Sequence, residues 1–158
     1  MPSTPPEPAA VRAVPSSVEL TGWGRTAPSG ADLRRPTSPT ELRRALPTTF
    51  ERGLIARGLG RSYGDAAQNA GGTVVETTDV CSFTIHESDP NAPTVLVTAD
   101  AGASIDRLLH ALVPQGLFVP VTPGTRLVTV GGAIAADIHG KNHHLKGSWC
   151  NHVVSMHL

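Results

Sequence analysis

A short segment late in the sequence, DIHGKNHH at residues 137–144, gathers residue types that can move protons. Its imidazoles, above all that of His139, belong to a group that titrates near neutrality and can accept or release a proton at physiological pH. Lys141 can hold developing negative charge beside them, whereas His144 is interpreted as structural. The segment therefore predicts proton handling or oxyanion stabilisation.

The same histidines leave a metal site open as an alternative. His139 and His143 are four residues apart, as in a zinc-binding helix. However, Gly140 stands where such a helix carries glutamate, and glycine is a poor helix former. A further ligand would have to come from elsewhere, for example from Asp137. Proton handling is the favoured interpretation, and we predict no metal.

Two glycine-rich segments could bind an anion. In RGLGRSYGD, residues 57–65, Gly58, Gly60 and Gly64 allow successive backbone N–H groups to converge, and Arg57 and Arg61 add positive charge that suits a pyrophosphate. The spacing GxGxxxG matches neither the dinucleotide-binding GxGxxG nor a P-loop. A plain glycine turn between two strands therefore stays an alternative.

The second segment, PGTRLVTVGGAIAADIHG, covers residues 123–140. Gly124 permits a turn, while Gly131 and Gly132 remove side chains where a flat ligand or another backbone comes close. Together the two segments predict a two-part cradle for an extended phosphate-bearing ligand, with close packing of elements as the alternative.

Short strands and helices must position these segments. Strands are expected at residues 33–36, 53–57, 71–78, 92–102 and 117–125, and a further one begins at 151–158. A brief helix capped by Thr40 should end before Pro47. The clearest helix starts at the cap Ser104, carries an apolar stripe and ends at Gly116, and another can begin within 126–140. This alternation predicts a mixed α+β layer fold.

The bulk composition limits the function classes. Thirteen basic and thirteen acidic side chains cancel, so nothing predicts a nucleic-acid partner. Cys81 and Cys150 form no metal or disulfide pattern and are interpreted as ordinary thiols. Residues 1–18 are proline-rich and are expected to form a disordered lead-in, without a signal peptide. No segment has the apolar length of a membrane span. We therefore expect a cytoplasmic or cell-envelope-associated protein. Peripheral contact with a membrane is compatible with this expectation.

The order and separation of the two segments resemble the FAD-binding domain of the vanillyl-alcohol-oxidase superfamily, also called PCMH-type. Within it, WGRTAP, ARGLGRSYGD and DIHGKNHH resemble a branch that oxidises the ribosyl 2′-hydroxyl of a polyprenyl phosphate in the synthesis of cell-wall arabinan precursors. The resemblance implies that residues 19–158 form this domain, incomplete at its C-terminal side and without the substrate domain.

The resemblance also implies roles for single residues. His139 and Lys141 would be catalytic, on the substrate side of the flavin ring, and would help to remove the hydroxyl proton. The residues that would line the FAD are Ala56, Arg57, Gly58, Leu59, Gly60, Arg61, Ser62, Tyr63, Gly64, Asp65, Ala66, Gly124, Thr129, Val130, Gly131, Gly132, Ala136, Asp137, Ile138 and His139. Several members attach FAD to a histidine of the first segment. Arg61 stands at that position here, so non-covalent FAD is predicted.

The partners implied are a polyprenyl-phosphate sugar as substrate and a companion NADPH-dependent reductase that completes an epimerisation. The family continues well beyond residue 158, so this chain is expected to be an inactive amino-terminal fragment. Two other functions stay open: an FAD-dependent oxidase of a free alditol or aldonolactone, and a non-catalytic remnant that keeps the scaffold without the chemistry.

Overall fold

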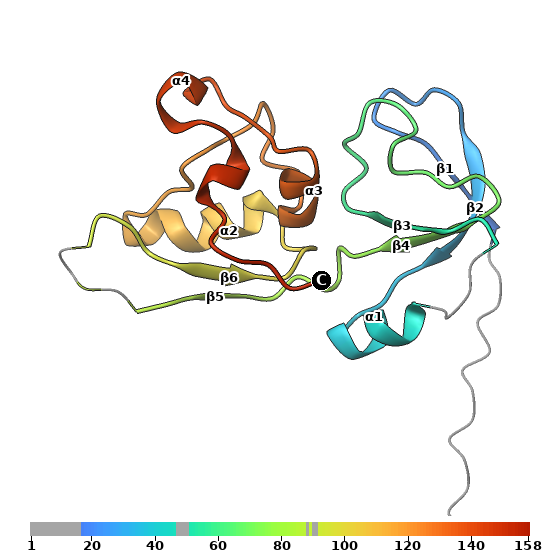
Figure 1. Ribbon diagram of the computed structural model, residues 1–158, viewed down its shortest axis with the longest axis horizontal. Coiled ribbons are helices and arrows are strands. Elements are labelled where there is room, and N and C mark those ends of the chain that lie inside the picture. The colour runs from blue at the N-terminus through green and yellow to red at the C-terminus, as the bar shows by residue number, and fades with distance from the viewer. Residues whose placement is uncertain (1–16, 47–50, 88, 90–91) are drawn as a thin grey trace, which may run out of the picture.

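The computed structural model describes residues 17–46, 51–87, 89 and 92–158. Its elements form two groups that lie side by side (Figure 1). The sheet lobe contains β1 to β4 and α1, and the helix lobe contains β5, β6, α2, α3 and α4. The fold is α+β, as predicted. Among the described helices, none has the length and apolar character that a bilayer crossing requires.

The sheet lobe is a four-stranded sheet in the order β1-β2-β4-β3. The strands are β1 (Ser17–Leu20), β2 (Ser29–Arg34), β3 (Leu54–Arg57) and β4 (Thr73–Glu76). β4 pairs in parallel with both β2 and β3, and β1 is antiparallel to β2. Val74 and Val75 of β4 point to opposite faces of the sheet and both are buried, so both faces are covered at this central strand. β1 was not predicted, and it takes Ser17 and Val18 from the expected lead-in; residues 1–16 lie outside the described residues.

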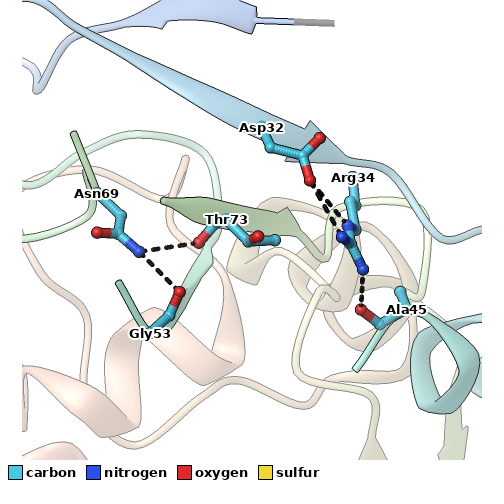
Figure 2. Close-up of polar contacts among 6 residues, drawn as sticks. All are labelled: Asp32, Arg34, Ala45, Gly53, Asn69 and Thr73. Atoms are coloured by element: carbon cyan, nitrogen blue, oxygen red, sulfur yellow. Dashed lines mark hydrogen bonds and ion pairs between the residues drawn. The ribbon is translucent and has the colours of Figure 1, made fainter. Parts of the chain in front are cut away.

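Two side chains fasten the parallel strands to their surroundings (Figure 2). Asn69 donates its amide to the carbonyl oxygens of Gly53 (3.1 Å) and Thr73 (3.3 Å), which ties the start of β3 to the start of β4. Arg34 pairs with Asp32 and donates to the carbonyl oxygen of Ala45 at 2.7 Å, so it satisfies the end of α1 (Pro39–Ala45). The loop that leaves β3 therefore starts and returns at fixed points.

The predicted N-cap is confirmed for α2 and wrong for α1. α2 (Ile105–Leu112) has Ser104 as its N-cap, as predicted, and the Ser104 hydroxyl accepts from the Arg107 N–H at 3.1 Å. A 3₁₀ turn (Val113–Gln115) extends it to Gly116, which has a φ of 74°. The predicted cap of α1 is wrong: Ser38, not Thr40, accepts the Glu41 N–H. Pro39 follows it in the first helical turn, where proline is favoured.

The helix lobe packs α2 against a two-stranded antiparallel sheet, β5 (Phe83–Ile85) and β6 (Val97–Ala99). Ile105, Leu108 and Leu112 of α2 are buried in this core. Around the core lie α3 (Val130–Ala135), α4 (His143–Lys146) and a 3₁₀ turn (Trp149–His152). The strands predicted at 117–125 and 151–158 are wrong, since neither stretch is part of a sheet.

The lobes meet at a seam where backbone segments approach closely. The Gly102 N–H donates to the Val80 carbonyl oxygen at 3.1 Å, and a Cβ on Gly102 would stand 2.5 Å from that oxygen. Beside it, Thr129 is buried at the start of α3. The seam therefore brings the end of β4 against the segments on either side of α2.

Candidate functional site

The glycine loop, residues 58–66, follows the edge strand β3. Two of its carbonyl oxygens accept hydrogen bonds from the segment after β1. The Ser62 carbonyl oxygen accepts from the Trp23 N–H at 2.6 Å, and the Tyr63 carbonyl oxygen accepts from the Gly24 N–H at 3.4 Å. Gly22 is buried under the loop, where a Cβ would collide with backbone oxygens. The sequence after β1 thus binds one side of the loop.

The backbone N–H donors of the glycine loop, in contrast, have no protein acceptor among the described residues. In the part of the chain that the structure describes, no backbone N–H of residues 58–66 donates to a protein acceptor. The loop is half-buried to exposed, and Gly60 has a φ of 66°, which a residue with a side chain rarely adopts. N–H groups without a protein acceptor are available to an anion. The anion site stays a prediction beside the plain-turn alternative.

Arg57, which precedes the loop, and Arg61, which lies in it, both bind carbonyl oxygens of the protein. The Arg57 guanidinium donates to the carbonyl oxygens of Ala67 (2.9 Å) and Thr21 (2.6 Å). Arg61 donates to the Leu59 carbonyl oxygen at 2.7 Å, and its guanidinium carbon lies 4.4 Å from the centre of the Trp23 ring. Both add positive charge near the loop, Arg57 with two guanidinium nitrogens on carbonyl oxygens and Arg61 with one. Trp23 anchors the loop through this stacking.

The second glycine segment lies against the first. A Cβ on Gly58 would stand 3.0 Å from the Thr129 side-chain methyl, so the two segments touch as the cradle hypothesis requires. Their backbone N–H groups differ, however. Those of Val130 and Gly131 donate to the carbonyl oxygens of Ala103 and Ala101, both at 2.8 Å. The Gly132 N–H donates to the Thr129 hydroxyl at 3.2 Å.

The predicted role of the second segment is therefore corrected in part. Gly131 is required by close packing, because a Cβ there would be 3.0 Å from the Ala101 Cβ. The N–H groups of Val130, Gly131 and Gly132 are used within the helix lobe and are not free for a phosphate. The first segment offers the donors, and the second offers a wall of small residues beside them.

The candidate catalytic residues lie on a closed loop, residues 137–150, which we call the His loop. Gly140 is buried where a Cβ would stand 2.5 Å from the Thr122 carbonyl oxygen, and the Asn142 amide donates to the Pro120 carbonyl oxygen at 3.0 Å. The loop therefore docks on the stretch that precedes the second glycine segment. His139 and Lys141 are exposed, where a substrate can reach them.

The imidazoles of the His loop contact one another as rings. His139 and His143 meet edge to face with their centroids 5.6 Å apart, and His143 and His144 lie 3.8 Å apart. The His143 Nδ1 is 3.0 Å from the Gly140 carbonyl oxygen. Within the described residues, no group of three His, Cys, Asp or Glu is placed to hold a metal ion. The zinc alternative gains no support from this geometry.

Asp137 closes the base of the His loop. Its carboxylate accepts from the Cys150 N–H and from the Ser148 hydroxyl, both at 2.9 Å. These hydrogen bonds, that of the Cys150 backbone foremost, hold the pKa of the Asp137 carboxyl below its ordinary value of 3.8. The hydrogen bond to Asp137 in turn raises the pKa of the Cys150 thiol. Sequence reasoning missed Ser148, although a serine after glycine is a common capping signal.

Acid is expected to open the His loop. Because the pKa of Asp137 is lowered in the folded loop, the stabilisation is complete well above 3.8 and is lost as the pH falls through the lower, folded value. In a Trp23→Phe background, the fluorescence of Trp149 should report this opening as the pH falls below the ordinary range of an aspartate. Asp137→Asn should remove the transition. A transition that persists unchanged in Asp137→Asn would contradict this assignment.

The site fits the diphosphate of FAD. The free N–H groups of the glycine loop match its negative charge. The contact between Gly58 and Thr129 is already closed, since a Cβ on Gly58 would stand 2.4 Å from the Thr129 hydroxyl oxygen. Of the other predicted FAD residues, Ile138 packs on the core, Ala136 is exposed at the end of α3, and Tyr63 is 79% exposed. The Asp137 carboxylate is directed to Ser148 and Cys150 instead.

The fold and this site define a flavin-binding domain, and the chain belongs to the family described as FAD binding domain, which matches residues 32–158. FAD is thus the cofactor of its class.

Among curated proteins, the chain is similar to decaprenylphosphoryl-beta-D-ribose oxidase of Mycolicibacterium smegmatis. The identity is 55% over 142 residues, which cover 88% of this chain and 30% of that protein. The chain therefore spans about a third of the length of this relative.

Solved structures share the fold at low identity. Cholesterol oxidase of B. sterolicum aligns with a TM-score of 0.55 and 18% identity, over 87% of this chain and 27% of that one. Alkyldihydroxyacetonephosphate synthase aligns with a TM-score of 0.59 and 19% identity, over 80% and 25%. At these identities the likeness concerns the fold alone.

Proposed function

We propose that this chain holds the FAD diphosphate of an oxidoreductase that acts on the ribosyl 2′-hydroxyl of decaprenylphosphoryl-β-D-ribose. The run of free N–H groups in the glycine loop carries the cofactor half of the proposal. The similarity to a protein named for that oxidase activity supports the substrate half. A companion NADPH-dependent reductase and a role in cell-wall arabinan synthesis belong to the same proposal.

This chain would contribute cofactor binding and proton removal. Bound FAD supplies an acceptor for the hydride that leaves the carbinol carbon. His139 would take the proton of the hydroxyl, and Lys141 would hold the negative charge that develops beside it. Both are exposed on a loop that is closed at its base and docked on Pro120 and Thr122. Attachment through Arg61 is not expected, since its guanidinium is a donor only, so FAD should dissociate in denaturant.

FAD binding by this chain tests the cofactor half directly. Quenching of flavin fluorescence should give a Kd that ADP-ribose, which shares the diphosphate, raises by competition. Riboflavin, which lacks it, should bind at least about tenfold more weakly. Equal binding of riboflavin and FAD would place the donors of the glycine loop away from the diphosphate and overturn the assignment.

The substrate half is tested on a longer gene product that includes this chain. Flavin bleaching with polyprenylphosphoryl ribose, and none with a free alditol or aldonolactone, is the expected result. The reverse selectivity would favour the alditol or aldonolactone oxidase. Tight FAD binding without reduction by any of the three would favour a non-catalytic flavin domain.

A further inference from the structure

Asp137 has an unusual backbone at the point where α3 gives way to the His loop. Its φ is 40°, in the left-handed region that only glycine and short polar residues adopt readily. Its N–H donates to the Ile134 carbonyl oxygen at 3.0 Å and so ends the helix. The residue is thus fixed by the helix on one side while its side chain reaches across the loop.

Each carboxylate oxygen of Asp137 accepts one of the hydrogen bonds that close the His loop. One oxygen accepts from the Ser148 hydroxyl and the other from the Cys150 N–H, on the returning limb. An ionised carboxylate accepts at both oxygens, whereas an amide of the same shape accepts at only one. The closure therefore uses both acceptor oxygens of Asp137, and the Ser148 hydroxyl has a second acceptor in the Asn151 side chain at 3.1 Å.

The returning limb also pairs with the backbone at His139. His139 and Ser148 form an isolated antiparallel bridge, and the Trp149 N–H donates to the Ile138 carbonyl oxygen at 2.8 Å. The Asn151 side chain adds a hydrogen bond to the Ser148 N–H at 2.8 Å. Ser148 is thus shared: its hydroxyl is bound by Asp137 and its backbone lies beside His139.

We propose that Asp137 is a positioning residue of this site, whose carboxylate closes the His loop and thereby sets where His139 stands. This differs from the role implied by resemblance, in which Asp137 lines the FAD. The importance of His139 rests on the proposed function, but the closure of the loop is a property of this chain and is measurable without any ligand.

The test compares three variants in the full 158-residue chain. Asp137→Asn removes the charge and keeps the shape. Ser148→Ala removes one of the two partners. Asp100→Asn is the matched control, because the Asp100 carboxylate accepts a backbone N–H from Ser82 at 2.9 Å, outside the His loop. The readouts are amide hydrogen exchange along the chain and the imidazole ¹⁵N resonances of His139.

Asp137→Asn should speed exchange at Trp149 and Cys150 about tenfold and shift the His139 resonances, while exchange in α2 stays at the parental rate. Ser148→Ala should show a smaller effect at the same places, and Asp100→Asn none. Parental exchange and resonances in Asp137→Asn would overturn the proposal, and so would faster exchange spread evenly over the chain, which would mark a general stabilising role. Because no readout requires flavin, a failure to bind FAD would count against the proposed function alone.

Discussion

Gly22→Ala is expected to cost the protein about 2 kcal/mol of stability and to weaken FAD binding about 30-fold. A Cβ at Gly22 would overlap the Gly64 carbonyl oxygen and stand 2.7 Å from that of Ser62. Both atoms are backbone, so no side chain can swing aside to make room. The glycine loop must shift, and the 2.6 Å hydrogen bond from Trp23 to Ser62 is lost with it.

Gly64→Ala is the matched control, because it lies in the loop itself. A Cβ at Gly64 would meet no atom within 4 Å, and its φ lies outside the left-handed region. Its stability should stay within about 0.5 kcal/mol of the parent. Urea unfolding and flavin fluorescence titration measure the two effects separately. Parental stability in Gly22→Ala would show that the loop does not depend on the segment beneath it.

The local patterns of the sequence were sufficient for the elements that carry their own signals. The Ser104 cap, the apolar stripe and Gly116 specify α2 within one stretch of chain, and the structure confirms all three. The strand predicted at 71–78, launched from a Gly-Gly turn, contains β4, which is the buried centre of the sheet. These signals are local, so a single sequence contains them.

The wrong strand at 117–125 shows what such patterns lack. Val119 and Val121 of this stretch are both buried, as alternate residues of a strand against a core would be. However, Pro120 between them has no N–H to donate, and its carbonyl oxygen accepts from Asn142 instead of a neighbouring strand. An alternating pattern shows which side chains face inward, but a strand also requires a partner.

In the candidate site, too, local signals could be predicted and contacts between distant segments could not. The sequence located the glycine loop and the His loop, because glycine and histidine are conspicuous there. It did not show that Arg57 binds two distant carbonyl groups, or that Asp137 binds Ser148, because both depend on contacts between segments. A charged residue beside a glycine loop suggests a ligand contact, and only the fold shows that its donors are already used.

Arg57→Met is expected to destabilise the chain by about 2–4 kcal/mol and to abolish tight FAD binding. Methionine keeps the apolar stem and removes the donors to Ala67 and Thr21, which hold the far end of the loop and the segment after β1. With both contacts gone, the free N–H groups of residues 58–66 lose their fixed arrangement. The Kd for FAD should rise at least about 30-fold, as measured by flavin fluorescence.

Two further variants separate the structural role of Arg57 from its charge. Arg57→Lys keeps the charge, but an ammonium group cannot reproduce the fork of two parallel donors, so most of the stability should still be lost. Arg61→Met removes the stacking on Trp23 and the hydrogen bond to Leu59, and should cost only about 1 kcal/mol. If Arg57→Lys instead restores both parental stability and FAD affinity, then Arg57 serves the diphosphate as a charge, and the tie between the two segments is not what holds the loop.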